Sequence, residues 1–164
     1  MQFRIEQFFM SNKEPKGILV SVGGAEDKGT DLELGIISRN NLNFFEIGIL
    51  KSVVNVIGKT DARIEVVTTA SQIPDEVGDN YLDAFKKLGC SNVGHMKIRN
   101  REDAMMKEYS DRLLACDAIM FSGGNQLRLT SIFGGTEFLE ILHRRYENER
   151  FIIAGTSAGA MAMS

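Results

Sequence analysis

A serine lies between two glycines near the end of the chain, in the segment Gly155-Thr156-Ser157-Ala158-Gly159. This G-x-S-x-G spacing follows an apolar run and precedes residues that favour a helix, which is the context of a nucleophile elbow. In such a turn the strand and the helix approach so closely that side chains beside the serine would clash, and glycine avoids the clash. The serine hydroxyl is then exposed at a helix N-terminus, where free amides favour developing negative charge. Ser157 is therefore the candidate nucleophile for attack on an acyl carbon.

An acyl-transfer nucleophile also needs hydrogen-bond donors for the oxyanion that forms. The amide of Ala158, the residue after the serine, is expected to be one donor. The second donor must come from a neighbouring strand end, and the glycine turn at 123–125 offers the amide of Gly124 or of Asn125. Losing one such donor lowers the rate by about 10²–10³.

A serine hydroxyl is unreactive near neutral pH unless a base takes its proton. The chain has two histidines. His95 falls early in an expected strand, and His143 falls in the middle of a helix that should pack on a sheet face, away from the serine turn. Neither is expected to act as the base. Either the hydroxyl works with an unusual partner or the base lies beyond Ser164. We expect the 164 residues to be a portion of a longer enzyme that is inactive alone.

The glycine-rich turn at 23–30, GGAEDKGT, resembles a phosphate-binding loop in its glycine spacing, but Thr30 stands where that loop needs lysine. Glu26 and Asp27 would also repel phosphate, so no nucleotide is expected. No His, Cys, Asp or Glu cluster has the spacing of a metal site, and no cofactor is expected. Glu26 and Asp27 fit two interpretations equally well, as solvated charges of a turn or as the lining of a pocket for a charged substrate.

Alternating strands and helices position these turns. Strands are expected at 17–22, 62–71, 92–98, 117–124 and 151–155. Helices are expected at 43–58, 74–89, 101–116 with a break near Ser110, 125–133 and 136–148, with another starting at 157. This alternation predicts an α/β fold with a mostly parallel sheet covered on both faces. The three glycine turns follow strands, so they should share the rim at the carboxyl ends, where ligands bind in such sheets.

Length and composition fit one globular domain, with a flexible lead-in at 1–16 and the domain at 17–164. Hydrophobic residues make up 43% and charged residues 25%, and the net charge is -3. No basic stripe indicates nucleic-acid binding, and HRR at 143–145 is interpreted as a solvated helix face. No window approaches the roughly 20 apolar residues of a membrane span. Cys90 and Cys116 form no disulfide framework, which fits a reducing, cytoplasmic location. A homodimer is compatible with this class of fold.

Four segments, taken in order, resemble one known family: ILVSVGGAEDK (18–28), HMKIRNREDA (95–104), IMFSGGNQLRL (119–129) and GTSAGAMAMS (155–164). Together they are similar to the cyanophycinases, serine peptidases of family S51. The resemblance implies a three-layer αβα sandwich related to the class I glutamine amidotransferases. It also implies hydrolysis of cyanophycin, a polyaspartate chain with arginine on each β-carboxyl, to β-aspartyl-arginine dipeptides.

The same resemblance implies site residues. Ser157 takes the place of the family's nucleophile, and Gln126 that of a glutamine that contacts substrate. The triad histidine and its carboxylate partner follow the serine in the family, and this chain has no such residues. The substrate carries both signs of charge, which Glu26, Asp27 and Arg128 could complement at the rim.

Three other functions share some of these features. A β-aspartyl dipeptidase of the same class would act on small peptides, and an amidotransferase-like domain with a decayed site would serve as a binding module. A lipase-type esterase also carries G-x-S-x-G, but Thr156 and Ala158 flank the serine here and no HGGG loop is present.

Overall fold

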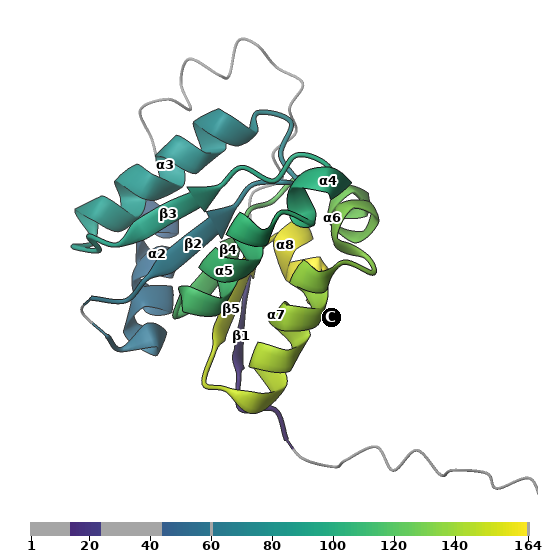
Figure 1. Cartoon of the computed structure of the whole chain (residues 1–164). Helices are drawn as coiled ribbons and strands as arrows, with labels where there is room; N and C mark the ends of the chain where they lie inside the picture. The colour runs from purple at the N-terminus through teal and green to yellow at the C-terminus, as the bar shows by residue number, and fades with distance from the viewer. Residues whose placement is uncertain (1–13, 24–43, 60, 164) are drawn as a thin grey trace, which may run out of the picture.

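The computed structural model describes residues 14–23, 44–59 and 61–163. Its sheet has five strands: β1 (Ile18–Val22), β2 (Ile64–Val67), β3 (Val93–Met96), β4 (Ala118–Phe121) and β5 (Ile152–Thr156). Their order across the sheet is β1-β5-β4-β2-β3, and every neighbouring pair is parallel. The parallel α/β sheet expected from the sequence is confirmed (Figure 1). The domain boundary at residue 16 stays a prediction, because residues 1–13 lie outside the described part.

Helices lie between successive strands, and one more helix follows β5. They are α2 (Phe44–Ile57), α3 (Pro74–Lys87), α4 (Arg101–Ala104), α5 (Lys107–Ala115), α6 (Gln126–Phe133), α7 (Glu137–Asn148) and α8 (Ala158–Met161). The single helix expected at 101–116 is two helices, and the break lies at Met105–Met106 rather than near Ser110. Asn100 and Asp103 form a reciprocal capping box that starts α4, and Met106 has extended backbone before α5. Ser110 lies inside α5.

Alternate strand residues build two separate cores, one on each face of the sheet. On one face, Ile64, Val66, Met120, Ile152 and Ala154 pack with residues of α2 and α3. On the other face, residues of α4 to α8 pack against a second set: Val67, Ile119, Phe121 and Ile153. This alternation follows from the two-residue period of a strand. The chain is therefore a three-layer αβα sandwich, with α5 and α7 in front of the sheet in Figure 1.

Strand order brings the three glycine turns together. β5 lies between β1 and β4, with Val22 beside Thr156 and Phe121 beside Gly155 in the register. Because all three strands are parallel, their carboxyl ends meet at one rim of the sheet. Gly23, Gly123 and Gly155 therefore share that rim, as the sequence predicted.

Two charged residues are buried inside the fold, and neither burial was predicted from the sequence. Glu65 on β2 is 1% exposed, and its carboxylate accepts hydrogen bonds from Arg112 on α5 and from Arg63. The interpretation of 143–145 as a solvated face is wrong for Arg145, which is 8% exposed.

Arg145 is buried because it lies one turn after Ile141, on the face of α7 that packs on the sheet. Its guanidinium donates to the carbonyls of Leu113 and Cys116, and it lies 4.0 Å from the centre of the Phe151 ring. The burial of this cation is therefore compensated by hydrogen bonds and by a cation–π contact.

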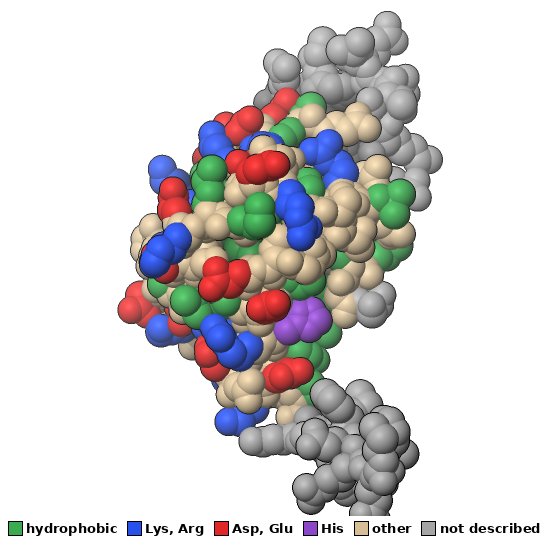
Figure 2. Space-filling model, turned by 45° about the vertical axis from the view of Figure 1, so that its right-hand side comes forward, with side chains coloured by type: hydrophobic (Ala, Val, Ile, Leu, Met, Phe, Trp, Pro, Cys, Tyr) green, Lys and Arg blue, Asp and Glu red, His purple; other side chains and the backbone are tan. Residues whose placement is uncertain are grey.

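The face of the molecule seen in Figure 2 has no dominant charge. On this face, acidic and basic side chains alternate without a stripe of either sign. Within the described residues, no helix has the length and apolar character needed to cross a membrane.

Candidate active site

Ser157 lies in a strand-to-helix turn at the sheet rim. β5 ends at Thr156 and α8 begins at Ala158, so the serine is the single residue between them. Its backbone has φ 48° and ψ -111°, and it is the one non-glycine residue with positive φ in the described part of the chain. Such strain is typical of a nucleophile elbow and must be held by the surrounding structure.

The two glycines of the motif are required by close backbone contacts. A Cβ added at Gly155 would lie 2.5 Å from the carbonyl carbon of Gly159. A Cβ added at Gly159 would lie 2.5 Å from the carbonyl oxygen of Phe121 on β4. Both distances are far below van der Waals contact, and the atoms involved are backbone. The glycines therefore allow β5, α8 and β4 to meet at the serine.

Three further contacts fix the elbow. The amide of Ser157 donates to the carbonyl of Val22 at the end of β1 (3.1 Å). The carbonyl of Ser157 accepts a hydrogen bond from the amide of Met161 (2.9 Å). The side chain of Thr156 lies on the α2–α3 face, where its Oγ1 is 3.1 Å from the phenolic oxygen of Tyr81. The turn is thus held by β1 and by helices of both outer layers.

The two candidate amides of the 123–125 turn differ in whether they already donate a hydrogen bond. The amide of Asn125 donates to the carbonyl of Ala70 (2.9 Å), and its side chain caps α6 by accepting from Leu127. Asn125 was predicted as a possible oxyanion donor, and this bond to Ala70 makes its amide unsuitable. Gly124 remains, since its amide has no acceptor among the described residues.

Ala158 is the residue predicted to supply the first donor. It is fully buried at the start of α8, and within the described part of the chain its amide donates to no acceptor. The turn that carries Gly124 reaches the serine closely, because a Cβ at Gly123 would lie 3.3 Å from Cβ of Ser157. The amides of Ala158 and Gly124 are therefore the two candidate donors near the serine.

Gln126 and Arg128, two of the residues predicted to contact substrate, differ in exposure and in hydrogen bonding. Gln126 is exposed as the first residue of α6. Arg128 is half-buried, and its Nε donates to the carbonyl of Thr69 after β2 (2.9 Å), so part of its guanidinium supports the rim. Glu26 and Asp27 lie outside the described residues.

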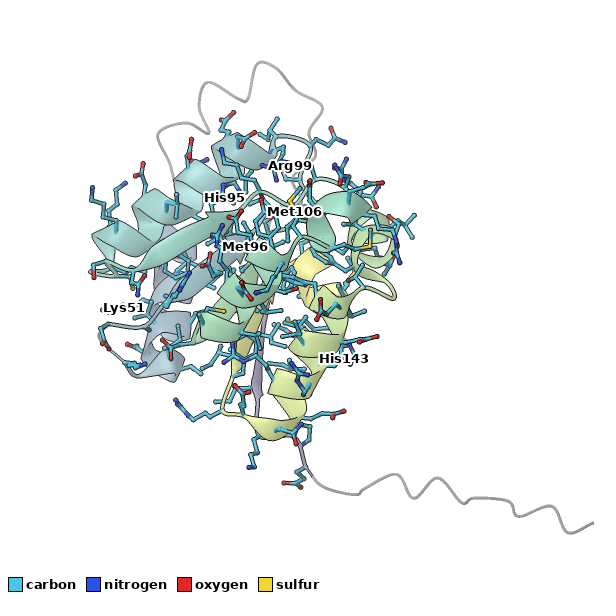
Figure 3. All side chains as sticks on the ribbon, in the orientation of Figure 1. Lys51, His95, Met96, Arg99, Met106 and His143 are labelled. Atoms are coloured by element: carbon cyan, nitrogen blue, oxygen red, sulfur yellow. The ribbon has the colours of Figure 1, made fainter. Side chains whose placement is uncertain are left out.

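Neither histidine reaches the serine. His95 is on β3, three strands from β5, or about 14 Å at the usual strand spacing. Its Nε2 lies 2.8 Å from Oγ1 of Thr68. His143 is exposed on α7 (Figure 3). The proposed serine chemistry cannot use either ring as its base.

The surroundings of His95 hold its ring in place, away from the serine. Burial lowers the pKa of His95 below 6.5, and the nearby cations Arg99 and Lys97 lower it further. Asp75 and Asp79 oppose this effect. The ring is packed between β2 and α3, where a Cβ at Gly78 would clash with it.

The cysteines are unpaired, and burial raises the pKa of Cys116 to about 12, so its thiol is inert near neutral pH. In the part of the chain that the structure describes, no group of three His, Cys, Asp or Glu residues could hold a metal ion.

One contact at the site was missed from the sequence. Strand alternation places Thr156 on the same face as Ile152 and Ala154, so its side chain could have been assigned to the α2–α3 layer. Its partner Tyr81 is far away in the sequence, and no local signal connects the two.

Comparison with known proteins identifies the family. The family model "Peptidase family S51" matches residues 38–164, which is more than half of the chain. The chain belongs to peptidase family S51. The resemblance stated from the sequence is thereby confirmed at the level of the family.

Several relatives of this S51 chain are named cyanophycinases. It is 34% identical to the cyanophycinase of Synechococcus elongatus over 148 residues, 90% of this chain and 41% of the relative. Identity is 31% to the cyanophycinase of Nostoc sp. (strain PCC 7120 / SAG 25.82 / UTEX 2576), over 90% of this chain and 45% of the relative. Identity is 32% to the cyanophycinase of Geminocystis herdmanii, over 87% of this chain and 47% of the relative. The chain therefore spans less than half the length of these relatives.

A solved structure supports the fold of this S51 chain. The crystal structure of a peptidase from an acI-B1 Actinobacterium superposes with a TM-score of 0.65 at 21% identity. The match covers 93% of this chain and 58% of the other.

Proposed function

We propose that the complete protein is a serine-type exopeptidase that hydrolyses cyanophycin and releases β-aspartyl-arginine dipeptides. Membership in a peptidase family supports the hydrolase class, and the cyanophycinase relatives support the substrate. The observation that carries the serine mechanism is the backbone of Ser157, held at φ 48° between β5 and α8 at the carboxyl rim.

In the proposed reaction, Oγ of Ser157 attacks the carbonyl carbon of the terminal backbone amide while a base takes the hydroxyl proton. The carbonyl oxygen becomes an oxyanion, which the amides of Ala158 and Gly124 stabilise. The C–N bond then breaks, and the departing amine takes the proton from the base. Water attacks the resulting ester with the same base, which frees the product and restores the serine.

The proposed base comes from sequence outside these 164 residues, because both histidines lie away from Ser157. The carboxylate that would orient it is proposed to come from the same part. Supply of both groups by a later segment agrees with the family order stated above.

Gln126, Glu26, Asp27 and Arg128 are proposed to contact the substrate. Gln126 is exposed at the start of α6, directly after the 123–125 turn. Arg128 retains guanidinium nitrogens besides the Nε bonded to Thr69, and these could pair with an aspartate carboxylate.

The test compares the complete protein with Ser157→Ala and with the matched control Ser131→Ala, which removes an exposed hydroxyl from α6. The assays are release of β-Asp-Arg from insoluble cyanophycin and labelling by a serine-directed fluorophosphonate. Parent and Ser131→Ala are expected to turn over and to label, whereas Ser157→Ala should do neither. Unchanged dipeptide release by Ser157→Ala would refute the nucleophile.

The same assays separate the alternatives. Turnover of a β-aspartyl dipeptide without release from the polymer would replace the substrate and keep the mechanism. A parent protein that neither turns over nor labels would indicate a binding module with a decayed site.

A further inference from the structure

We infer that Tyr81 is a positioning residue for Ser157 and acts through Thr156. This inference rests on the proposed function, because it concerns the reactivity of the same serine. Tyr81 lies on α3 in an outer layer, and its phenolic oxygen is 3.1 Å from Oγ1 of Thr156. Thr156 immediately precedes the serine in the chain.

The contact acts on the peptide that sets the serine's orientation. Ser157 holds a strained φ of 48°, which persists only where neighbouring contacts determine it. Rotation of the Thr156–Ser157 peptide would turn both the serine amide and its side chain. A hydrogen bond on the Thr156 side chain restrains that rotation from the α2–α3 layer.

The restraints on the elbow from Val22, Met161 and Gly159 are backbone contacts. They are the hydrogen bonds of Ser157 to Val22 and Met161, and the close approach of Gly155 to Gly159. The Tyr81–Thr156 pair is a side-chain contact and can be removed without changing the backbone. Substitution therefore separates its effect from that of the turn itself.

Tyr81 is well suited to hold a fixed position. Its ring stacks on Phe85, with centroids 6.5 Å apart and an angle of 29° between the planes. Phe85 is fully buried in the α2–α3 core, and Tyr81 packs against the same core. The hydroxyl is thus presented by a ring that the core holds in place. Small displacements of a reacting atom lower rates strongly, so the restraint should appear in catalysis.

The experiment uses the complete protein with Tyr81→Phe, Thr156→Val and the double variant. Thr156→Ser keeps the hydroxyl, and Tyr109→Phe on α5 removes a phenol from the other face of the sheet as a matched control. The readouts are kcat and KM for β-Asp-Arg release, the rate of inactivation by fluorophosphonate, and the thermal midpoint.

Tyr81→Phe and Thr156→Val are each expected to lower kcat and the inactivation rate about three- to tenfold, the effect of losing one hydrogen bond. KM should change by less than about twofold, and the double variant should lose no more than the worse single variant. Thr156→Ser and Tyr109→Phe should stay close to the parent.

Two results would overturn the inference while leaving the proposed function intact. One is parental kcat and inactivation rate in Tyr81→Phe alongside an inactive Ser157→Ala. The other is a double variant in which the two losses multiply. Activity retained by Ser157→Ala would instead overturn the proposed function itself.

Discussion

At the scale of single residues, the elbow depends on the absence of side chains as much as on the serine. Gly159 lies against the backbone of β4, and Gly155 lies against Gly159. These contacts are between backbone atoms, which cannot move without shifting a strand. The motif's glycines therefore support both the fold and the orientation of Ser157.

We expect Gly159→Ala to destabilise the protein by about 1–3 kcal/mol, the usual effect of overpacking, and to slow fluorophosphonate labelling of Ser157. The added methyl would lie 2.5 Å from the carbonyl oxygen of Phe121. Denaturant unfolding and labelling kinetics measure the two effects.

Gly48→Ala is the matched control for this prediction. A Cβ at Gly48 meets nothing within 4 Å, and the residue lies inside α2. The change should therefore stabilise the helix by about 0.5–1 kcal/mol. Equal stability of Gly159→Ala and the parent would contradict the steric argument.

The elbow could be predicted from the sequence because its requirements are local. Two glycines at fixed spacing and a strand before a helix are enough to place Ser157. Which of the two candidate amides is free could not be predicted, because the amide of Asn125 donates to the carbonyl of Ala70, far away in the sequence. Which amides are free depends on how strands assemble, and no local pattern records it.

At the scale of elements, a buried ion pair joins β2 to α5. The carboxylate of Glu65 is 2% exposed, and Nε of Arg112 donates to its Oε1 (3.2 Å) while a second nitrogen donates to its Oε2 (2.5 Å). Gly94 on β3 leaves room for this pair, because a Cβ there would clash with the carboxylate. The pair therefore sets how α5 sits on the sheet.

We expect Arg112→Met to lower the free energy of unfolding by about 3–5 kcal/mol, because it leaves Glu65 buried without its main partner. Lys107→Met is the control on the same helix, since it breaks an exposed pair with Asp111 worth about 0.3–0.5 kcal/mol. Urea unfolding measures both variants. A similar small loss in the two would contradict the role of the buried pair.

His95 should make stability depend on pH. Burial and the neighbouring cations Arg99 and Lys97 lower the pKa of His95 in the folded state, against the opposing effect of Asp75 and Asp79. The unfolded state then binds the proton more readily, so His95 destabilises the fold as pH falls below about 6.5.

We expect His95→Gln to reduce the loss of stability between pH 7 and pH 5. His143→Gln, at an exposed position on α7, should leave that loss unchanged. Thermal unfolding at several pH values measures the effect. The same pH slope in His95→Gln and the parent would rule out this contribution.

Element order was predictable because strands and helices alternate with clear punctuation, as at Pro74 and Gly89. The break between α4 and α5 was misplaced because it depends on the Asn100–Asp103 capping box and an extended Met106. The burial of Glu65 and Arg145 was not predictable, since each charge finds its partners on another element.

At the scale of the whole molecule, β1 forms one edge of the described sheet and is partly exposed on one face. Leu19 is 38% exposed and Ser21 is exposed, and both lie on the face that α7 covers at neighbouring strands. The S51 relatives are more than twice as long as the matched region. This partly exposed face of β1 lies beside β5, whose end carries Ser157.

We expect the 164-residue chain alone to release no β-Asp-Arg above background, because neither of its histidines lies near Ser157. The measurement compares this chain with the complete protein at equal concentration, after circular dichroism has checked that both are folded. Turnover by the short chain at the rate of the complete protein would show that the base is among these residues.

Because Ser157 has a positive φ, the residue that would best stabilise the fold at position 157 differs from the residue that the proposed reaction needs. Glycine adopts φ 48° without strain, so Ser157→Gly should relieve a conformational penalty of roughly 1 kcal/mol that Ser157→Ala retains. A laboratory selection for heat resistance alone would thus favour glycine at this position and discard the proposed nucleophile. Engineering of a hardier variant should hold residue 157 constant and seek its gains elsewhere.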